Sequence, residues 1–135
     1  MGSLSEPVAE EVDLALSRIK SKPFKLRLNE LGSFGDAHRA RTVWVGLEHS
    51  NALSNLHSKI DNALNVLGLE REKRKYLPHL TLGRLTNSTP DDVARWIESN
   101  GQFHPLEFEV TRMMLFSSHR TSKGSDYRPE RHYVF

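Results

Sequence analysis

Helical and strand-forming segments alternate along this chain of 135 residues, and their order limits the folds available to it. Three segments carry apolar residues at helical spacing, and five shorter ones alternate apolar with polar residues as half-buried strands do. In the order helix, strand, strand, helix, strand, helix, strand, strand, several strands follow one another directly, as in antiparallel hairpins. The expected fold is α+β, with mostly antiparallel sheets and the helices packed outside.

Capping residues mark the ends of the three expected helices. Ser5 is the expected N-cap of the first helix, which Pro23 stops, and Gly68 ends the second. Thr89, followed by Pro90 and two acidic residues, is a strong start for the third. The apolar stripes are Val8, Val12, Leu16 and Ile19; Leu53, Leu56, Ile60, Leu64 and Leu67; and Val93, Trp96 and Ile97.

The strands are expected at 24–28, 42–48, 77–84, 106–116 and 127–135. On this interpretation 32–40 is a loop, and both tryptophans, Trp44 and Trp96, belong to the core. A chain of this length can form one domain with a modest core, so the sequence predicts a single domain over residues 1–135.

The composition is ordinary for a soluble globular protein, with 37% apolar and 27% charged residues. No apolar run reaches the length of a membrane span, and the first residues lack the pattern of a secretory signal. The absence of cysteine excludes disulfides, thiolate metal sites and cysteine nucleophiles. These features fit a cytoplasmic protein without a membrane partner.

The formal net charge of +2 is too small to indicate nucleic-acid binding by itself. Local basic clusters are more informative: 71–75 (REKRK), Arg39 with Arg41, and Arg120 with Lys123, the two pairs lying in expected loops. Each could steer phosphate groups toward a site, although a solvated charged surface also explains any one of them.

The segment 77–84 (LPHLTLGR) is the most informative about function. Side chains alternate along a strand, so His79 and Thr81 project from one face. An imidazole transfers protons near neutral pH, and a hydroxyl donates a hydrogen bond to a phosphoryl oxygen. The pair could serve an anionic phosphate, or it could be the polar edge of a half-buried strand. Arg84 falls on the other face by parity, unless Gly83 allows a bulge that turns it back.

This string resembles the His-x-Thr motif of the 2H phosphoesterases, specifically the bacterial and archaeal RNA 2′,3′-cyclic phosphodiesterases, also called 2′-5′ RNA ligase-like proteins. The resemblance covers nearly the whole chain. It implies two pseudo-symmetric lobes of antiparallel sheet around a cleft. Further segments that match the family, in its order, are 24–28 with the G-x-F turn at 32–34, the R-x-x-W-V-G string at 41–46, and 115–118 (LFSS) with Gly124 and Tyr127 after it.

The family is defined by two His-x-Thr strands, whereas only the second is matched. An internal repeat points to the same gap: two similar helix-strand units span 27 positions (7 to 34) and 26 positions (90 to 116). His79 lies 11 positions before the second unit (90 − 79), and the same count before the first passes Met1. We therefore expect an N-terminally truncated domain with an incomplete first lobe. Chance similarity between the units and a short protein with half a site are the alternatives.

The resemblance implies hydrolysis of an RNA terminal 2′,3′-cyclic phosphate to a 2′-phosphomonoester, with 2′-5′ ligation as the reverse reaction. One imidazole acts as base and another as acid, while hydroxyls stabilise the charge on the non-bridging oxygens. No metal or other cofactor is required. His79 and Thr81 are then one of two catalytic pairs, acting on RNA ends or nucleotides with a cyclic phosphate, and this chain alone is expected to be impaired.

The resemblance also suggests substrate-binding residues. Arg41, at the mouth of its strand, and Arg84 could contact phosphate, and Phe34 could stack on a terminal base. Ser117 and Tyr127 match motif positions near the cleft. Structural alternatives exist as well: Arg84 could cover the outer face of the sheet, Phe34 could pack on the core, and Tyr127 could pack on its hairpin.

Other functions stay open. A second His-x-Thr at 119–121 could replace the missing pair, although coincidence also explains it. The chain could be a non-catalytic nucleotide- or RNA-binding module that kept one phosphate-gripping strand, or an unrelated α+β domain with a structural His79. The family implies a monomer, and association through an exposed sheet edge is the alternative.

Overall fold

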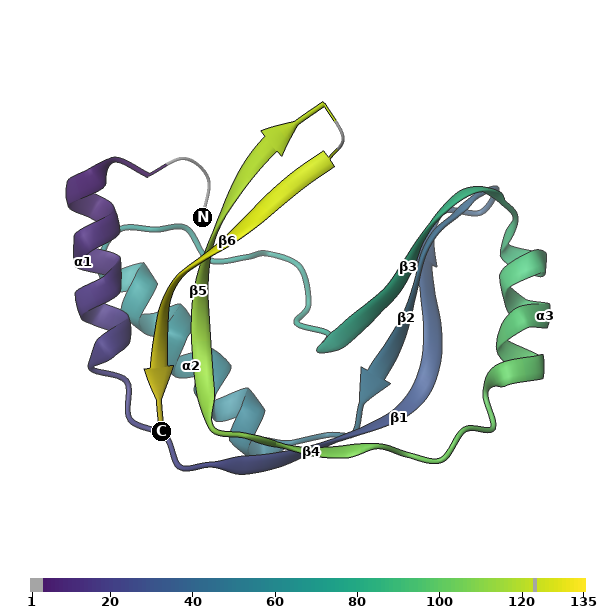
Figure 1. Ribbon diagram of the computed structural model, residues 1–135, viewed down its shortest axis with the longest axis horizontal. Coiled ribbons are helices and arrows are strands. Elements are labelled where there is room, and N and C mark those ends of the chain that lie inside the picture. Colours follow the sequence, from purple (N-terminus) through teal and green to yellow (C-terminus); the bar gives the residue numbers. More distant parts are fainter. Residues whose placement is uncertain (1–3, 123) are drawn as a thin grey trace. The chain divides into compact units, whose positions relative to one another are not determined.

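The computed structural model describes residues 4–122 and 124–135, so Lys123 of the basic pair lies outside the described residues. None of its helices has the length and apolar composition needed to cross a bilayer, as far as the described residues go. The α+β class is confirmed (Figure 1). The elements are α1 (Glu6–Ser17), β1 (Phe24–Gly35), β2 (Ala40–Leu47), α2 (Asn51–Val66), β3 (His79–Ser88), α3 (Pro90–Asn100), β4 (Glu107–Val110), β5 (Arg112–Thr121) and β6 (Gly124–Val134).

The strands form two sheets. One has the order β3-β2-β1-β4, and the other is the two-stranded hairpin β5-β6. The β1-β2, β2-β3 and β5-β6 pairs are antiparallel, as the hairpin-like order of the sequence indicated.

The prediction of a single strand at 106–116 is wrong. It is divided at Thr111 into β4 and β5, which belong to different sheets. The backbone N–H of Phe135 donates to the carbonyl of Thr111 (2.9 Å) at the point of division. The alternation of apolar and polar residues that runs from 106 to 111 stops here, because Thr111 and Arg112 are polar in succession and 113–116 are all apolar. The sequence therefore does carry a local sign of the break. β5 also extends to Thr121, which places Arg120 in a strand and not in a loop.

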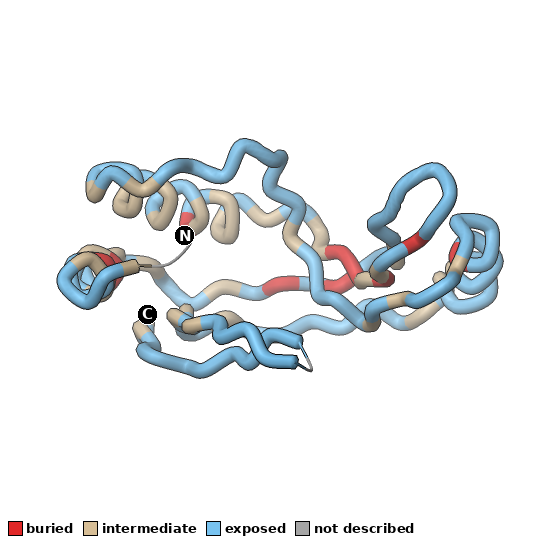
Figure 2. Tube along the Cα trace, turned by 90° about the horizontal axis from the view of Figure 1, so that it is seen from above, coloured by how far each residue is buried: buried red, intermediate tan, exposed pale blue. Residues whose placement is uncertain are grey.

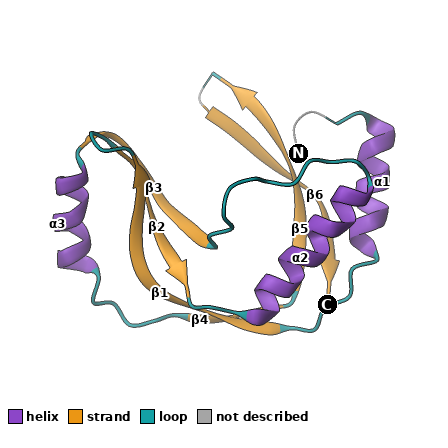
Figure 3. Ribbon diagram, turned by 180° about the vertical axis from the view of Figure 1, so that it is seen from behind, coloured by secondary structure: helices purple, strands orange, loops and turns teal. Residues whose placement is uncertain are grey.

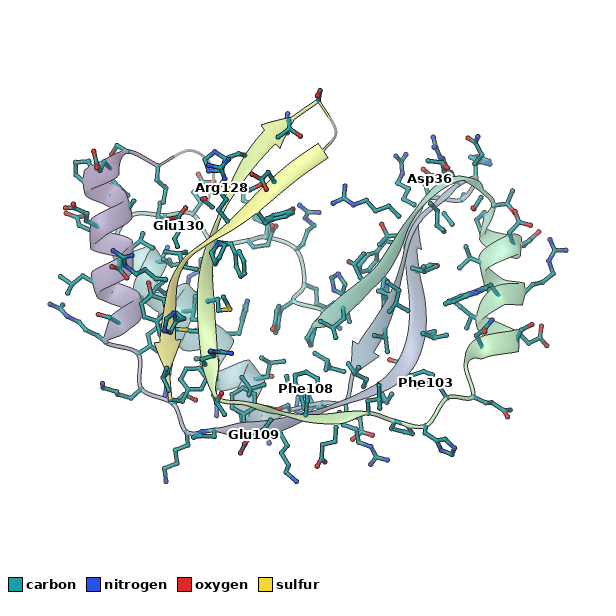
Figure 4. The ribbon with its side chains drawn as sticks, viewed as in Figure 1. Asp36, Phe103, Phe108, Glu109, Arg128 and Glu130 are labelled. Carbon is teal, nitrogen blue, oxygen red and sulfur yellow. The ribbon has the colours of Figure 1, made fainter. Side chains whose placement is uncertain are left out.

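The loop expected at 32–40 is mostly strand, because β1 continues to Gly35 and β2 begins at Ala40. The short turn between them is closed by Asp36, which lies at that end of the hairpin (Figure 4). Its Oδ1 accepts hydrogen bonds of 3.0 Å from the backbone N–H groups of His38 and Arg39. An aspartate that holds two backbone donors is a common way to close a turn.

The two helices that begin near a proline differ at their N-termini. The Thr89 hydroxyl accepts from the N–H of Asp92, whose carboxylate accepts the N–H of Thr89, so α3 begins with a capping box. Ser5 is the N-cap of α1 but makes no side-chain capping bond. The α1 helix ends at Ser17, before the expected stop at Pro23, whereas Gly68 does follow the end of α2, with φ +79°.

The chain divides into two compact units. Unit 1 contains residues 1–24, 51–73 and 109–135, and unit 2 contains residues 25–50 and 74–108. Buried residues form only short stretches of the trace (Figure 2). Among the described residues no polar or charged residue is fully buried, so the core of each unit is apolar.

In unit 1, α1 and α2 contribute the buried residues Val12, Leu16 and Leu56. Asp13 of α1 accepts hydrogen bonds from the Tyr133 hydroxyl (2.6 Å) and from Arg131 Nε (3.3 Å), both on β6. The Tyr133 hydroxyl is the main reason that the pKa of Asp13 is lowered. These bonds hold the C-terminal strand against α1.

In unit 2, α3 lies against β2 (Figure 3). Val93 of α3 packs with Ala40 and Val43 of β2, and Ile97 is packed against this cluster. Trp96, expected in the core, is instead 41% exposed. It fits the same helical stripe as Val93 and Ile97, but it is not among the residues packed in the cluster that these two form with β2. One face of the β1-β2-β3 sheet is thus covered by α3.

Candidate active site

The strand β3 carries one extra residue opposite β2. Trp44 pairs with Thr81, whereas the preceding residue, Val43, pairs with Gly83. Leu82 therefore has no partner of its own and forms a β-bulge. A bulge shifts the alternation of side chains by one position, so the parity of β3 reverses at this point.

Because of this bulge, Arg84 lies on the same face as His79 and Thr81. Paired residues share a face of a sheet, and so do residues two apart on one strand. The partners of the three residues on β2 are two apart, which places all three on one face. These partners are Thr42 for Arg84, Trp44 for Thr81 and Gly46 for His79.

The imidazole of His79 is held in one orientation. Its Nδ1 lies 2.7 Å from the carbonyl oxygen of Leu77, and its ring meets the Phe34 ring edge-on at a centroid distance of 4.9 Å. A carbonyl oxygen can only accept, so Nδ1 carries a hydrogen whether the ring is neutral or charged. In the neutral ring Nε2 then has the lone pair, and within the described residues it has no hydrogen-bond partner.

The indole of Trp44 forms the floor beside this imidazole. Its centroid lies 5.3 Å from that of Phe34 and 5.9 Å from that of His79. Gly32 makes room for it, since a Cβ there would overlap the indole ring. The indole Nε1 is buried without a partner among the described residues, so the ring is positioned by packing and not by a hydrogen bond.

His79, Thr81 and Arg84 are all exposed. Neither the Thr81 hydroxyl nor the Arg84 guanidinium has a partner in the described part of the chain. The face therefore offers a proton-transfer nitrogen, a hydroxyl donor and a cation, all oriented by one pair of strands. This set can bind and act on a phosphate group.

Arg41 is placed differently. Phe34 and Gly35 of β1 pair with Thr42 and Ala40 of β2, so Arg41 is the extra residue of a second bulge. Its guanidinium lies 3.1 Å from Asp36. Asp36 has a lowered pKa, chiefly because of the His38 N–H and then because of Arg41. The charge of Arg41 is thus already matched by a carboxylate, and its contact with phosphate stays a prediction.

Ser117 and Tyr127 belong to the hairpin of unit 1. The Ser117 hydroxyl donates to Glu130 Oε1 (2.6 Å), and its oxygen lies 3.0 Å from His119 Nε2. Tyr127 pairs with Ser118, so it projects from the face opposite Ser117. It is 59% exposed. Figure 4 shows Glu130 on β6.

The pair at 119–121 differs from the pair on β3. The single hydroxyl hydrogen of Ser117 goes to Glu130, so His119 Nε2 must donate its own hydrogen to Ser117. The Thr121 hydroxyl donates to the carbonyl of Gly124 (2.8 Å). Both side chains of this second His-x-Thr are thus engaged in the hairpin.

Two features of the site were not found by sequence reasoning. Trp44 was expected in the core and not beside the imidazole of His79, although Gly32 and Gly46 were the available signals for an aromatic ring lying on neighbouring strands. The Leu77 carbonyl, which sets the tautomer of His79, leaves no trace in the sequence. As for metals, no group of three or more His, Cys, Asp or Glu residues suited to one occurs among the described residues.

Comparisons with known proteins identify the class to which this fold belongs. The chain superposes on the crystal structure of Escherichia coli LigT complexed with 3′-AMP with a TM-score of 0.74 and 20% identity, covering 99% of this chain and 72% of that one. The two chains therefore share a fold. The confirmed features are the antiparallel sheets with helices packed against them.

The sequence profile of the 2′-5′ RNA ligase superfamily matches residues 3–122, and the chain belongs to this family. The RNA 2′,3′-cyclic phosphodiesterase of Methanocaldococcus jannaschii is 30% identical over 131 residues, which cover 94% of this chain and 72% of its own. The enzyme of the same name from Aeropyrum pernix is 29% identical over 130 residues, covering 95% and 74%. The resemblance found in the motifs is confirmed.

Proposed function

We propose that this protein hydrolyses 2′,3′-cyclic phosphate groups at RNA ends, giving a 2′-phosphomonoester. The observation that carries the proposal is the shared face of β3, on which His79, Thr81 and Arg84 are exposed together. The names of the relatives support a catalytic function over a non-catalytic binding module.

The arrangement supports a role for each residue. A water molecule attacks phosphorus, the P–O3′ bond breaks, one proton leaves the water and another reaches O3′. His79 Nε2 serves one of these two proton transfers, because Nδ1 is bound to the Leu77 carbonyl. The Thr81 hydroxyl donates to a non-bridging oxygen, and Arg84 balances the negative charge.

One imidazole can carry out only one of the two proton transfers, because the attacking water and O3′ lie on opposite sides of the phosphorus. The reaction therefore needs a second proton-transfer group. His119 is the weaker candidate, since its Nε2 donates to Ser117 and the hydroxyl of Thr121 donates to the Gly124 carbonyl, which leaves only Nδ1 and no neighbouring hydroxyl for a phosphate. We therefore keep the expectation that residues 1–135 alone turn over slowly. Phe34 is half exposed beside His79 and is proposed to contact the terminal base. Ser117 and Tyr127 remain proposed substrate contacts.

The test is hydrolysis of a short RNA that ends in a 2′,3′-cyclic phosphate, followed by chromatography of the 2′-phosphate product. The His79→Ala variant should lose turnover, and Thr81→Ala should lose part of it. Binding of the cyclic RNA without any product, by the unaltered chain at high enzyme concentration, would support the binding module. Unchanged turnover by the His79→Ala variant would show that His79 is not a catalytic residue and would contradict the proposed site.

A further inference from the structure

A hollow bordered by basic residues lies in unit 1, on elements that do not contribute to the β3 site. The segment between α1 and β1 and the first turns of α2 border an open hollow of about 490 Å³. This volume is within the range of pockets that hold small ligands. We call it the lysine pocket after the residues that surround it.

Three lysines line the lysine pocket: Lys20 and Lys22 on the connecting segment, and Lys59 on α2. Within the described residues none of them has a carboxylate partner, and no acidic residue lines the pocket. Lys59 is held in place by a hydrogen bond of 2.6 Å from Nζ to the carbonyl of Lys20. Three uncompensated positive charges around one hollow attract an anion.

The floor of the pocket is apolar. Leu56 is 6% exposed there, and Phe24 lies beside it with its ring stacked on that of Phe135 at 6.4 Å. Asn55 adds an amide that can donate and accept. A ligand with a phosphate group and a flat apolar part suits this combination, as a nucleotide does.

We propose that the lysine pocket binds the sugar-phosphate backbone of single-stranded RNA, away from the end that is hydrolysed. Lysines act as point charges without the fixed fork of arginine, so they recognise charge and not one oriented group. The repeating phosphates of an RNA chain match such a site. The choice of RNA over a free nucleotide rests on the proposed function.

The test uses an RNA ten-mer with an ordinary 3′-hydroxyl end, so binding does not depend on hydrolysis. Lys20→Gln/Lys22→Gln removes two charges and keeps the Lys59 hydrogen bond. The matched control is Arg95→Gln/Arg112→Gln, which removes two exposed cations from α3 and β5. We expect the pocket variant to bind the ten-mer roughly 10-fold more weakly, and the slope of log K against log salt to fall by about 1.4, about 0.7 for each lost phosphate contact.

Amide NMR locates the contact. In the unaltered chain, the ten-mer should shift the signals of the Asn55 side chain and of Leu56. Equal losses in the pocket variant and the control, or shifts confined to unit 2, would overturn the proposal. Titration with AMP distinguishes the sources of phosphate: AMP binding as tight as that of the ten-mer would assign the pocket to free nucleotides and overturn the RNA assignment.

Hydrolysis of a 2′,3′-cyclic mononucleotide separates this inference from the proposed function. A mononucleotide has no further sugar-phosphate backbone for the lysine pocket to bind, so the Lys20→Gln/Lys22→Gln variant should hydrolyse it at the rate of the unaltered chain. Loss of ten-mer binding with unchanged hydrolysis supports the lysine pocket. Loss of hydrolysis in the same variant would place these lysines in the catalytic reaction and overturn it.

Discussion

The two units carry the same tripeptide pattern in two different environments. In unit 2, His79 keeps Nε2 open, because its hydrogen-bearing Nδ1 is fixed by a backbone carbonyl. In unit 1, His119 carries its hydrogen on Nε2 and donates it in a hydrogen bond to the Ser117 hydroxyl oxygen. Thr81 is exposed, whereas Thr121 closes the hairpin turn. The comparison teaches that the same His-x-Thr pattern leaves a ring nitrogen and a hydroxyl available on β3, whereas in the hairpin the hydroxyl and Nε2 are both engaged and only Nδ1 is left.

The largest expected effect comes from removing each histidine in turn. His79→Ala should lower turnover of a cyclic-phosphate RNA by about 10²- to 10⁴-fold, the usual contribution of a general acid or base. His119→Ala should stay within about twofold, because its Nε2–H is donated to Ser117 and the neighbouring Thr121 hydroxyl is engaged at the hairpin turn, so only the ring Nδ1 remains to take part. Steady-state hydrolysis measures both. Equal losses in the two variants would break the comparison.

The next effect concerns the aromatic support of His79. Gly32→Ala places a methyl group in the space of the Trp44 ring, so we expect a loss of roughly 1–3 kcal/mol in the free energy of unfolding and a slower turnover. Gly83→Ala is the control, because its Cβ would lie 3.8 Å from Val43 Cγ2, an ordinary contact. Urea unfolding followed by tryptophan fluorescence measures stability. A Gly32→Ala variant as stable as Gly83→Ala would contradict the packing role of Trp44.

A smaller effect separates the helices of the two units. Thr89→Ala removes the capping bond of α3 and should cost about 1 kcal/mol of stability. Ser5→Ala should cost little, since Ser5 makes no side-chain bond to α1. Urea midpoints of the two variants give the difference. Similar costs would mean that the two N-termini are equivalent.

The smallest effect is a pH dependence at the same capping box. The Thr89 backbone N–H, its hydroxyl and Arg95 lower the pKa of Asp92 from 3.8 to about 2. A lowered pKa stabilises the folded state above the unfolded value of 3.8, and this contribution is lost as the pH falls toward 2. Asp92→Asn should therefore flatten the fall of the urea midpoint between pH 4 and pH 2. An unchanged slope would exclude Asp92 as its source.

Local signals predicted most of the fold, because they act over a few residues. The cap at Thr89, the left-handed Gly68 and the alternating strand after Pro78 all lie where the sequence places them. The division at Thr111 was missed although the alternation stops at Thr111 and Arg112, because a change of phase does not by itself say that the two strands join different sheets. The exposure of Trp96 likewise depends on the width of the contact between α3 and β2.

The candidate site was predicted in part. The shared face of His79 and Thr81 follows from the period of a strand, and the bulge that brings Arg84 to this face was one of two open possibilities. The tautomer of His79 depends on a main-chain oxygen, and main-chain atoms are the same in every sequence. The engagement of His119 depends on Glu130, 11 positions away (130 − 119), across a hairpin whose register no single sequence fixes.

The unpaired Leu82 has a consequence for protein design. Transferring LPHLTLGR to a regular strand of another scaffold would keep the whole sequence, yet the arginine would project from the face of the sheet opposite the histidine. A graft that also copies the irregular pairing would keep the cation beside the imidazole. Deleting one residue between the threonine and the arginine should do the same on a regular ladder, because the spacing then becomes even.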